Sequence, residues 1–215
     1  MITPHKHTKA FTMIELVFVI VVIGIIAALA LPRLDRDVRQ EATENLLSAI
    51  RYTQHLALTD NKTDPSDANW QREFWQIRFN TDTDNLANFY TVFSDSITVD
   101  DDVQKEEAAI DPINGKYMFN ADGDTIIDAD ESPNIFIGKK YGINSMTFSG
   151  GCAGTEPQHI AFDNWGRPHN GLGTATNNYN RYMTSDCTII MGFADTSIQD
   201  LNITIAAETG YVTID

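Results

Sequence analysis

The stretch FTMIELVFVIVVIGIIAALALP, residues 11–32, decides the fold because it is almost entirely apolar. Phe11 to Leu31 is 21 residues with one charge, Glu15. A helix of this length spans about 30 Å, the thickness of the hydrocarbon core of a bilayer. Lys6 and Lys9 precede it. The positive-inside bias therefore predicts one membrane crossing, with residues 1–10 in the cytoplasm and the rest of the chain outside.

A secretory signal peptide is the alternative, because Ala28-Leu29-Ala30 has the small-x-small form of a signal peptidase site. The apolar run is longer than a usual signal core, and cleavage there leaves Glu15 unexplained. A charge fully in hydrocarbon costs about 2.5–3.5 kcal/mol, and the helix dipole at a first turn returns only about 0.3–1 kcal/mol. Glu15 therefore needs a partner, and the segment contains no Lys or Arg.

The stretch Ala10 to Leu16, together with Pro32, resembles the processing signal of type IV pilins and pseudopilins. In that family a prepilin peptidase cuts before an aromatic residue, which is then N-methylated. A glutamate follows four residues later, and a proline closes the apolar run. The resemblance implies cleavage between Ala10 and Phe11, although the family normally has Gly in place of Ala10. It also implies that Glu15 meets the freed α-amine of a neighbouring subunit in an assembled filament.

Helical periodicity resumes directly after Pro32, with apolar residues recurring from Leu34 to Ala57. Residues 33–60 are therefore expected to form an amphipathic continuation of the helix, which Pro32 kinks and does not end. The helix is predicted to stop near Asp60-Asn61, before a polar loop.

Residues 61–215 are predicted to form a β-rich head, because the apolar period changes to two. The fold class is therefore α+β, with one long N-terminal helix packed on antiparallel strands, which is also the pilin plan. The predicted strands are centred on residues 75–79, 89–93, 97–99, 135–137, 146–148, 159–162 and 188–191, and on a closing hairpin of residues 201–205 and 211–214.

Two stretches of the head resemble the H-type minor pseudopilins of type II secretion. Residues 162–168 read FDNWGRP, and residues 209–212 read TGYV at the closing hairpin. Both are similar to turns of that family, and both are also ordinary hairpin chemistry. The resemblance implies a minor pseudopilin stored in the inner membrane, with its head in the periplasm.

The charge is concentrated in one region. The chain carries a net charge of −15, and residues 95–131 hold 12 acids against Lys105 and Lys116. An acidic insertion is therefore expected over residues 95–133, and no nucleic-acid partner is expected. A role in DNA uptake stays open, since Arg167, Arg181, Lys139 and Lys140 could form a local basic patch.

A calcium loop is predicted within that insertion. In residues 120–131, NADGDTIIDADE, oxygen side chains fall at positions 1, 3, 5, 9 and 12, as in calcium loops of the EF-hand type. A solvated acidic loop is the alternative, because Thr125 replaces the turn glycine at position 6. The expected Ca²⁺ ligands are Asn120, Asp122, Asp124, the carbonyl of Ile126, Asp128 and Glu131.

The remaining chemistry-bearing residues are few. Cys152 and Cys187 are the only cysteines, and an even count in an oxidising compartment predicts one disulfide. His159, Asp163 and His169 are a weak candidate for a hydrolytic or metal site, and no phosphate loop or nucleophile elbow is present. The chain is therefore expected not to be an enzyme.

Two functions from different classes remain. The first is a structural subunit that prepilin peptidase processes and that joins other pilin-like subunits in a pilus or secretion filament. The second is a membrane-anchored or secreted periplasmic calcium-binding protein that acts alone. The mature N-terminus separates them, because it is Phe11 for the first and Met1 or Leu31 for the second.

Overall fold

The structure is a computed structural model, and it describes residues 12–80, 88–97, 103–121, 123, 125–154, 158–175 and 179–215, without the side chains of residues 28–37 and 174. The chain divides into two compact units, Met1–Val38 and Arg39–Asp215. The second unit is called the head below. Because the two units are separate bodies, each is described on its own.

Helix α1 spans Met13–Thr59, 47 residues, and therefore contributes to both units. It continues through Pro32, as the resumed periodicity predicts, and it ends one residue before Asp60. Within the head, one face of α1 is buried, because its apolar residues recur three or four positions apart. The core residues on this face are Ala42, Leu46, Ala49, Ile50 and Ala57.

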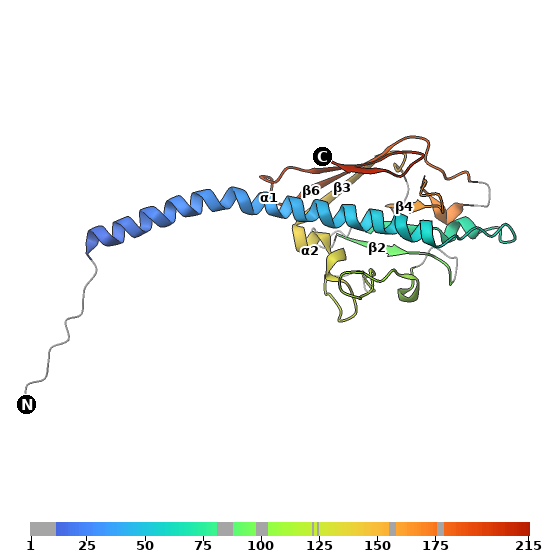
Figure 1. The fold of residues 1–215 in the computed structure, drawn as a ribbon, viewed down its shortest axis with the longest axis horizontal. Coiled ribbons are helices and arrows are strands. Elements are labelled where there is room, and N and C mark those ends of the chain that lie inside the picture. Colours follow the sequence, from blue (N-terminus) through green and yellow to red (C-terminus); the bar gives the residue numbers. More distant parts are fainter. Residues whose placement is uncertain are drawn as a thin grey trace, which may run out of the picture. The chain divides into compact units, whose positions relative to one another are not determined.

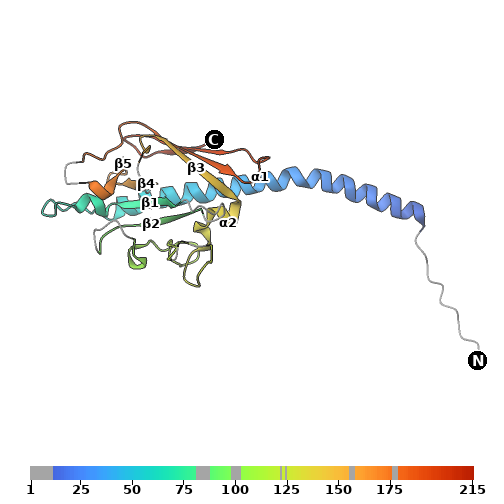
Figure 2. The ribbon, with the colours of Figure 1, turned by 180° about the vertical axis from the view of Figure 1, so that it is seen from behind.

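The described residues of the head form two antiparallel four-stranded sheets (Figures 1 and 2). The first has the order β2-β1-β4-β5, formed by Phe89–Phe93, Trp75–Asn80, Gln158–Phe162 and Pro168–His169. The second has the order β3-β6-β7-β8, formed by Ile143–Gly150, Cys187–Phe193, Leu201–Ile205 and Val212–Ile214. The α+β class is thus confirmed, since one N-terminal helix precedes antiparallel sheets.

Apolar residues at the sheet centres set the strand registers. Ile77 lies opposite Val92 on one side and Ile160 on the other, and all three are fully buried. In the second sheet Ile189 lies opposite Ile203. A slip of one residue would turn these side chains to the opposite face, so the alternation in the sequence specifies the pairing.

The predicted strand at residues 135–137 is wrong. These residues instead end the short 3₁₀-helix η3, Pro133–Ile135, and begin α2, Ile137–Tyr141. The side chain of Ser132 accepts a hydrogen bond from the Asn134 N–H and caps η3, while Pro133 supplies a favourable first helical residue. Gly142, at φ +73°, ends α2 in the left-handed conformation.

The part of the head that the structure describes has three other short 3₁₀-helices. They are η1 at Trp70–Glu73, η2 at Lys105–Glu107 and η4 at Leu172–Thr174. The predicted strand at residues 97–99 lies outside the described residues except for Ile97, which is a bend.

The predicted disulfide is confirmed. Cys152 and Cys187 are bonded, with their Cα atoms 5.1 Å apart. Cys187 is the first residue of β6 and lies opposite Gly150, the last residue of β3. The bond therefore ties the glycine-containing turn after β3 to the central pair of the second sheet.

Candidate functional sites

The predicted processing residues Ala10 and Phe11 lie outside the described residues. Thr12, the first described residue, precedes α1 and forms a reciprocal cap with Glu15. The Glu15 N–H donates to the Thr12 hydroxyl at 3.3 Å, and the Thr12 N–H donates to a Glu15 carboxylate oxygen at 3.4 Å. This is the geometry of a capping box, and the Glu15 N–H also donates to the carbonyl of Thr12 at 3.1 Å.

Sequence reasoning missed this role of Glu15. The signal was present, because Thr12-Met13-Ile14-Glu15 has the T-x-x-E spacing of a capping box. The carboxylate predicted to meet an amine between subunits thus has a partner within its own chain. The α-amine that cleavage would create belongs to Phe11, outside the described residues.

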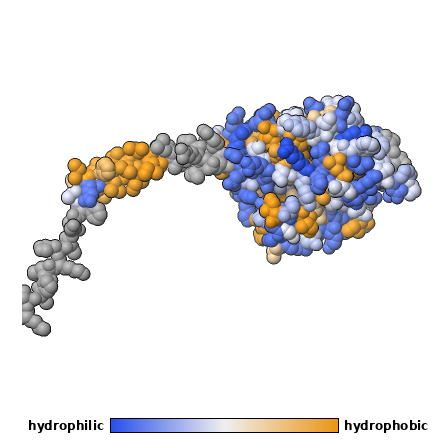
Figure 3. Space-filling view, in the orientation of Figure 1, coloured by the Kyte–Doolittle hydropathy of each residue, from blue (hydrophilic) through white to orange (hydrophobic). Residues whose placement is uncertain are grey.

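The first part of α1 exposes large apolar side chains on every side. Figure 3 shows this part as an almost uninterrupted hydrophobic surface. Met13, Phe18 and Ile26 are 85%, 69% and 61% exposed. No helix in the described part of the chain has an apolar stretch long enough to cross a membrane. The predicted span of residues 11–32 also includes Phe11 and the side chains of residues 28–32, including that of Pro32, which lie outside that part.

The predicted calcium loop is partly described, since Asp122 and Asp124 lie outside the described residues. Its last residue, Glu131, is buried, and its two carboxylate oxygens accept the N–H groups of Ala121 at 2.8 Å and Asp128 at 3.0 Å. The Glu131 side chain therefore closes the loop by accepting hydrogen bonds from the backbone of two other loop residues.

Asn120, the first residue of the loop, is also buried. Its side-chain oxygen accepts the N–H of Gly123 at 3.0 Å. Ile126 and Asp128 are exposed. Among the described residues, no three histidine, cysteine or acidic side chains form a group that could hold a metal.

Lysines compensate part of the negative charge around this loop. Lys105 forms an ion pair with Asp130, and this contact lowers the pKa of the Asp130 carboxyl against the small opposing effect of desolvation. Lys139 donates to the carbonyl of Thr125 at 3.0 Å. The described ends of the loop are thus held by contacts within the protein.

The turn of residues 163–167 joins β4 to β5 around a wholly buried carboxylate, Asp163. One oxygen of Asp163 accepts the N–H groups of Trp165 and Arg167, both at 2.9 Å. The other accepts the Arg167 side chain at 2.7 Å and lies 3.2 Å from Nε2 of His169. Burial alone would raise the pKa of Asp163, but the hydrogen bonds from His169, Arg167 and Trp165 outweigh it and hold the pKa below its usual value.

The structure shows what the three residues of the candidate hydrolytic or metal site, His159, Asp163 and His169, contact. Asp163 is engaged by its own turn, and His159 accepts the N–H of Leu172 at 3.0 Å through Nε2. The arrangement brings Asp163 and His169 together, but it joins His159 to a different segment. The contact between Asp163 and His169 therefore joins the start of the turn to strand β5.

The candidate basic patch divides between two regions. Lys139 and Lys140 lie on α2. Arg167 lies in the turn after β4, with its guanidinium 5.3 Å from the ring centre of Tyr182, and Arg181 precedes that tyrosine. These four residues thus do not come from one continuous surface element.

One residue of α1 joins the two stretches that resemble the H-type pseudopilins. The side-chain NH₂ of Gln54 donates to the carbonyl of Gly166 at 2.8 Å and to the carbonyl of Thr209 at 3.1 Å. A Cβ on Gly210 would lie 2.4 Å from the Gly166 carbonyl oxygen, so only glycine fits at this contact. No sequence pattern pointed to Gln54, because its partners are more than 100 residues away.

Comparison with known proteins identifies a motif near the N-terminus. The model of the family described as the prokaryotic N-terminal methylation motif matches residues 5–31. No curated protein and no solved structure matches the chain. The matched motif indicates membrane anchoring and a structural subunit in place of an enzyme. The chain therefore carries the N-terminal methylation motif that is characteristic of the precursors of type IV pilins and pseudopilins.

Proposed function

We propose that the chain is an H-type minor pseudopilin, a structural subunit of a type II secretion or type IV pilus-like filament. The observation that carries the proposal is the methylation motif at residues 5–31, placed at the start of a long helix that leads into a β-rich head. The H-type assignment is further supported by Gln54, whose side chain contacts both stretches that resemble H-type pseudopilins, residues 162–168 and 209–212.

In this function the apolar part of α1 anchors the subunit in the inner membrane before assembly, and prepilin peptidase cuts the chain there between Ala10 and Phe11. The head then lies in the periplasm. The disulfide between Cys152 and Cys187 supports this location, because such bonds persist in oxidising compartments. After processing, Glu15 exchanges its partner within the capping box for the amine of a neighbouring subunit.

The mature N-terminus tests the proposal. Mass spectrometry of the membrane-extracted protein should find a chain that begins at a methylated Phe11. A chain that begins at Met1 or Leu31 would instead favour the periplasmic protein that acts alone. Glu15→Ala should still be processed and inserted but should enter filaments poorly. Glu106→Ala, at an exposed acid of the head, is the matched control.

We also propose that residues 120–131 hold a structural Ca²⁺. The support is the spacing of amide and acidic side chains along the loop, with Asn120 and Glu131 buried at its two ends. Asp122, Asp124, Asp128 and the carbonyl of Ile126 would complete the ligand set. A hard cation with 6–8 oxygen ligands would relieve the repulsion among these acids.

Thermal unfolding of the full chain in detergent tests the calcium proposal. At 100 times its dissociation constant, Ca²⁺ would stabilise the fold by about 2.7 kcal/mol. The melting temperature should therefore be higher in Ca²⁺ than in EDTA. Asp124→Ala should remove most of this difference, and Asp195→Ala, in an exposed turn, should not. If calorimetry detects no binding up to millimolar Ca²⁺, the loop is a solvated insertion.

A further inference from the structure

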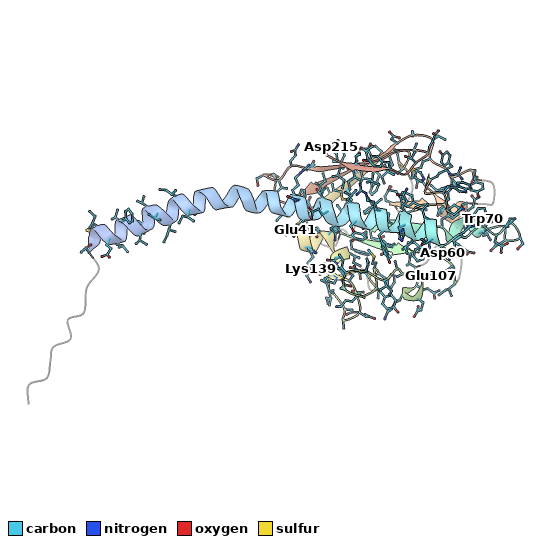
Figure 4. All side chains as sticks on the ribbon, in the orientation of Figure 1. Glu41, Asp60, Trp70, Glu107, Lys139 and Asp215 are labelled. Carbon is cyan, nitrogen blue, oxygen red and sulfur yellow. A yellow bond between two sulfur atoms is a disulfide. The ribbon has the colours of Figure 1, made fainter. Side chains whose placement is uncertain are left out.

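A pocket of about 400 Å³ lies on the head, between one face of α1 and the segments that pack beside it. Helix α1 forms one wall of the pocket, and α2 forms part of the opposite wall. Figure 4 labels Glu41 on α1 and Lys139 on α2. The α1 residues of the pocket are Glu41, Glu44, Asn45, Ser48, Ala49 and Tyr52. The opposite wall is formed by Tyr90, Asp111, Pro112, Ile113, Met118, Asn134, Lys140 and Tyr141.

Negative charge dominates this pocket. Asp111 is only 2% exposed, and its carboxylate accepts hydrogen bonds from neutral groups, namely the Ile113 N–H at 2.8 Å and the side-chain amides of Asn114 and Asn134 at 3.0 and 2.9 Å. Ser132 donates its hydroxyl to the same carboxylate. A buried carboxylate is costly without a compensating cation. Within the described residues, Asp111 takes part in no ion pair.

Two glutamates at the rim of the pocket add to its negative charge. Glu41 and Glu44 are both exposed, and among the described ion pairs neither has a cationic partner. Among the described residues that line the pocket, Lys140 is the one basic residue, and its ammonium donates to the side-chain oxygen of Asn134 at 2.8 Å. Three lining carboxylates therefore face one lysine.

The pocket is also aromatic. Tyr52, Tyr90 and Tyr141 line it, and the ammonium of Lys140 already lies 5.2 Å from the ring centre of Tyr141. Burial, followed by the charge of Asp111, raises the pKa of both Tyr52 and Tyr90. The negative potential of Asp111 thus extends to the tyrosines, and aromatic faces attract cations by themselves.

We propose that this pocket binds an organic cation on an apolar stem, an alkylammonium or guanidinium group such as a lysine or arginine side chain carries. A metal ion fits less well, because the Asp111 oxygens already accept several hydrogen bonds, Glu41 and Glu44 are exposed at the rim, and three tyrosines line the pocket. The volume lies within the usual range for small-molecule sites, about 300–1,000 Å³. The stem would pack on Ala49 and Met118.

The cation has two possible sources, a basic side chain of a neighbouring subunit or a free amine. Ile113, at the pocket, is 77% exposed, and a protein partner would cover it. The net charge of −15 makes a second copy of this chain an unfavourable partner. A different and more basic subunit is therefore the expected source, and this last step rests on the proposed function.

Ligand-observed NMR titration of the full chain in non-ionic detergent tests the binding itself. The probes are Nα-acetyl-lysine methylamide and Nα-acetyl-arginine methylamide, with Nα-acetyl-norleucine methylamide as the neutral analogue. The cationic probes should bind with millimolar affinity, at least about tenfold more tightly than the neutral analogue. Binding should weaken at high salt, because exposed charges are screened.

Three variants locate the binding in the pocket. Glu41→Gln and Glu44→Gln should each weaken it by about 1.5- to 5-fold. Tyr52→Leu should weaken it by about 2- to 5-fold. Glu106→Gln, an exposed acid outside the pocket, is the control. Equal affinity for the neutral analogue, or equal losses in the control, would overturn the proposal.

Filament incorporation distinguishes the two sources. If a neighbouring subunit supplies the cation, Glu41→Lys should impair incorporation and Glu106→Lys should not. Normal incorporation of Glu41→Lys, together with probe binding by the unmodified chain, assigns the pocket to a free amine. If the cationic probes do not bind in the NMR titration, the pocket proposal is wrong. The proposed function is unaffected, because its test is whether the mature chain begins at Phe11.

Discussion

Asp163 is predicted to be the residue on which the turn between β4 and β5 depends. Asp163→Asn keeps the size of the side chain but removes its charge, and it places an NH₂ donor or a neutral oxygen against the donors of Arg167. Arg167 is partly exposed, so the loss is that of hydrogen bonds to a charged group, about 1.5–3 kcal/mol. For a domain of about 150–250 residues each kcal/mol corresponds to about 2–4 °C, so the melting temperature should fall by about 3–12 °C.

The effect should depend on pH in a defined direction. The pKa of Asp163 is lower in the folded protein than its usual value, because of the hydrogen bonds from His169, Arg167 and Trp165. The charged carboxylate therefore stabilises the fold above the unfolded pKa of about 3.9, and this contribution is lost as the pH falls through the folded pKa. The difference between the native chain and Asp163→Asn should be full at pH 7 and should shrink below about pH 4.

The assay is thermal unfolding of the full chain in detergent, followed by near-UV circular dichroism and tryptophan fluorescence. Trp165 is 73% exposed on the turn itself and reports its local order. Asp195→Asn is the matched control, because Asp195 accepts hydrogen bonds within another turn but is exposed. If Asp163→Asn melts no lower than this control, the buried carboxylate does not hold the turn.

Three further predictions concern other contacts. Replacing Cys152 and Cys187 by serine should lower stability by about 4 kcal/mol on the chain-entropy account, measured by urea unfolding against the oxidised chain, and an unchanged midpoint would contradict it. Gln54→Ala removes two hydrogen bonds and should cost about 1–3 kcal/mol, whereas Gln40→Ala on the exposed face should cost almost nothing; equal losses would show that the contact is unimportant. Thr12→Ala removes the cap of α1 and should speed amide exchange in its first turn by about 2- to 30-fold, with Thr12→Ser as the control that retains the native rate.

Local patterns predicted most elements of the fold, because helices and strands are determined largely by residues that are close in the sequence. The long helix and the strands that alternate around Ile77 and Ile203 follow from periodicity alone. The segment Ile135-Phe136-Ile137 misled that reasoning, because three consecutive apolar residues fit a buried strand or a helical turn equally well. Ser132-Pro133 before it and Gly142 after it were the signals that favoured helix.

The sites were less predictable because they depend on contacts between distant segments. The spacing of Asn120 to Glu131 suggested ligands, but it could not show that Glu131 closes the loop through backbone N–H groups. The pocket requires α1 to pack beside the segment around Asp111, and no local pattern encodes that approach. The capping partnership of Thr12 and Glu15, by contrast, is local and was readable from spacing alone.

Arg39, the first residue of the head, has a mechanical consequence. Its guanidinium donates to the carbonyls of Gln199, Asp200 and Asp215, at 3.1, 3.2 and 2.8 Å. Helix α1 is continuous from Met13 to Thr59, so tension along its axis is carried by the hydrogen bonds of the helix itself. A load applied to the apolar part therefore enters the head at Arg39. There it is shared by two acceptors just before β7 and one just after β8, before it reaches the buried face of α1.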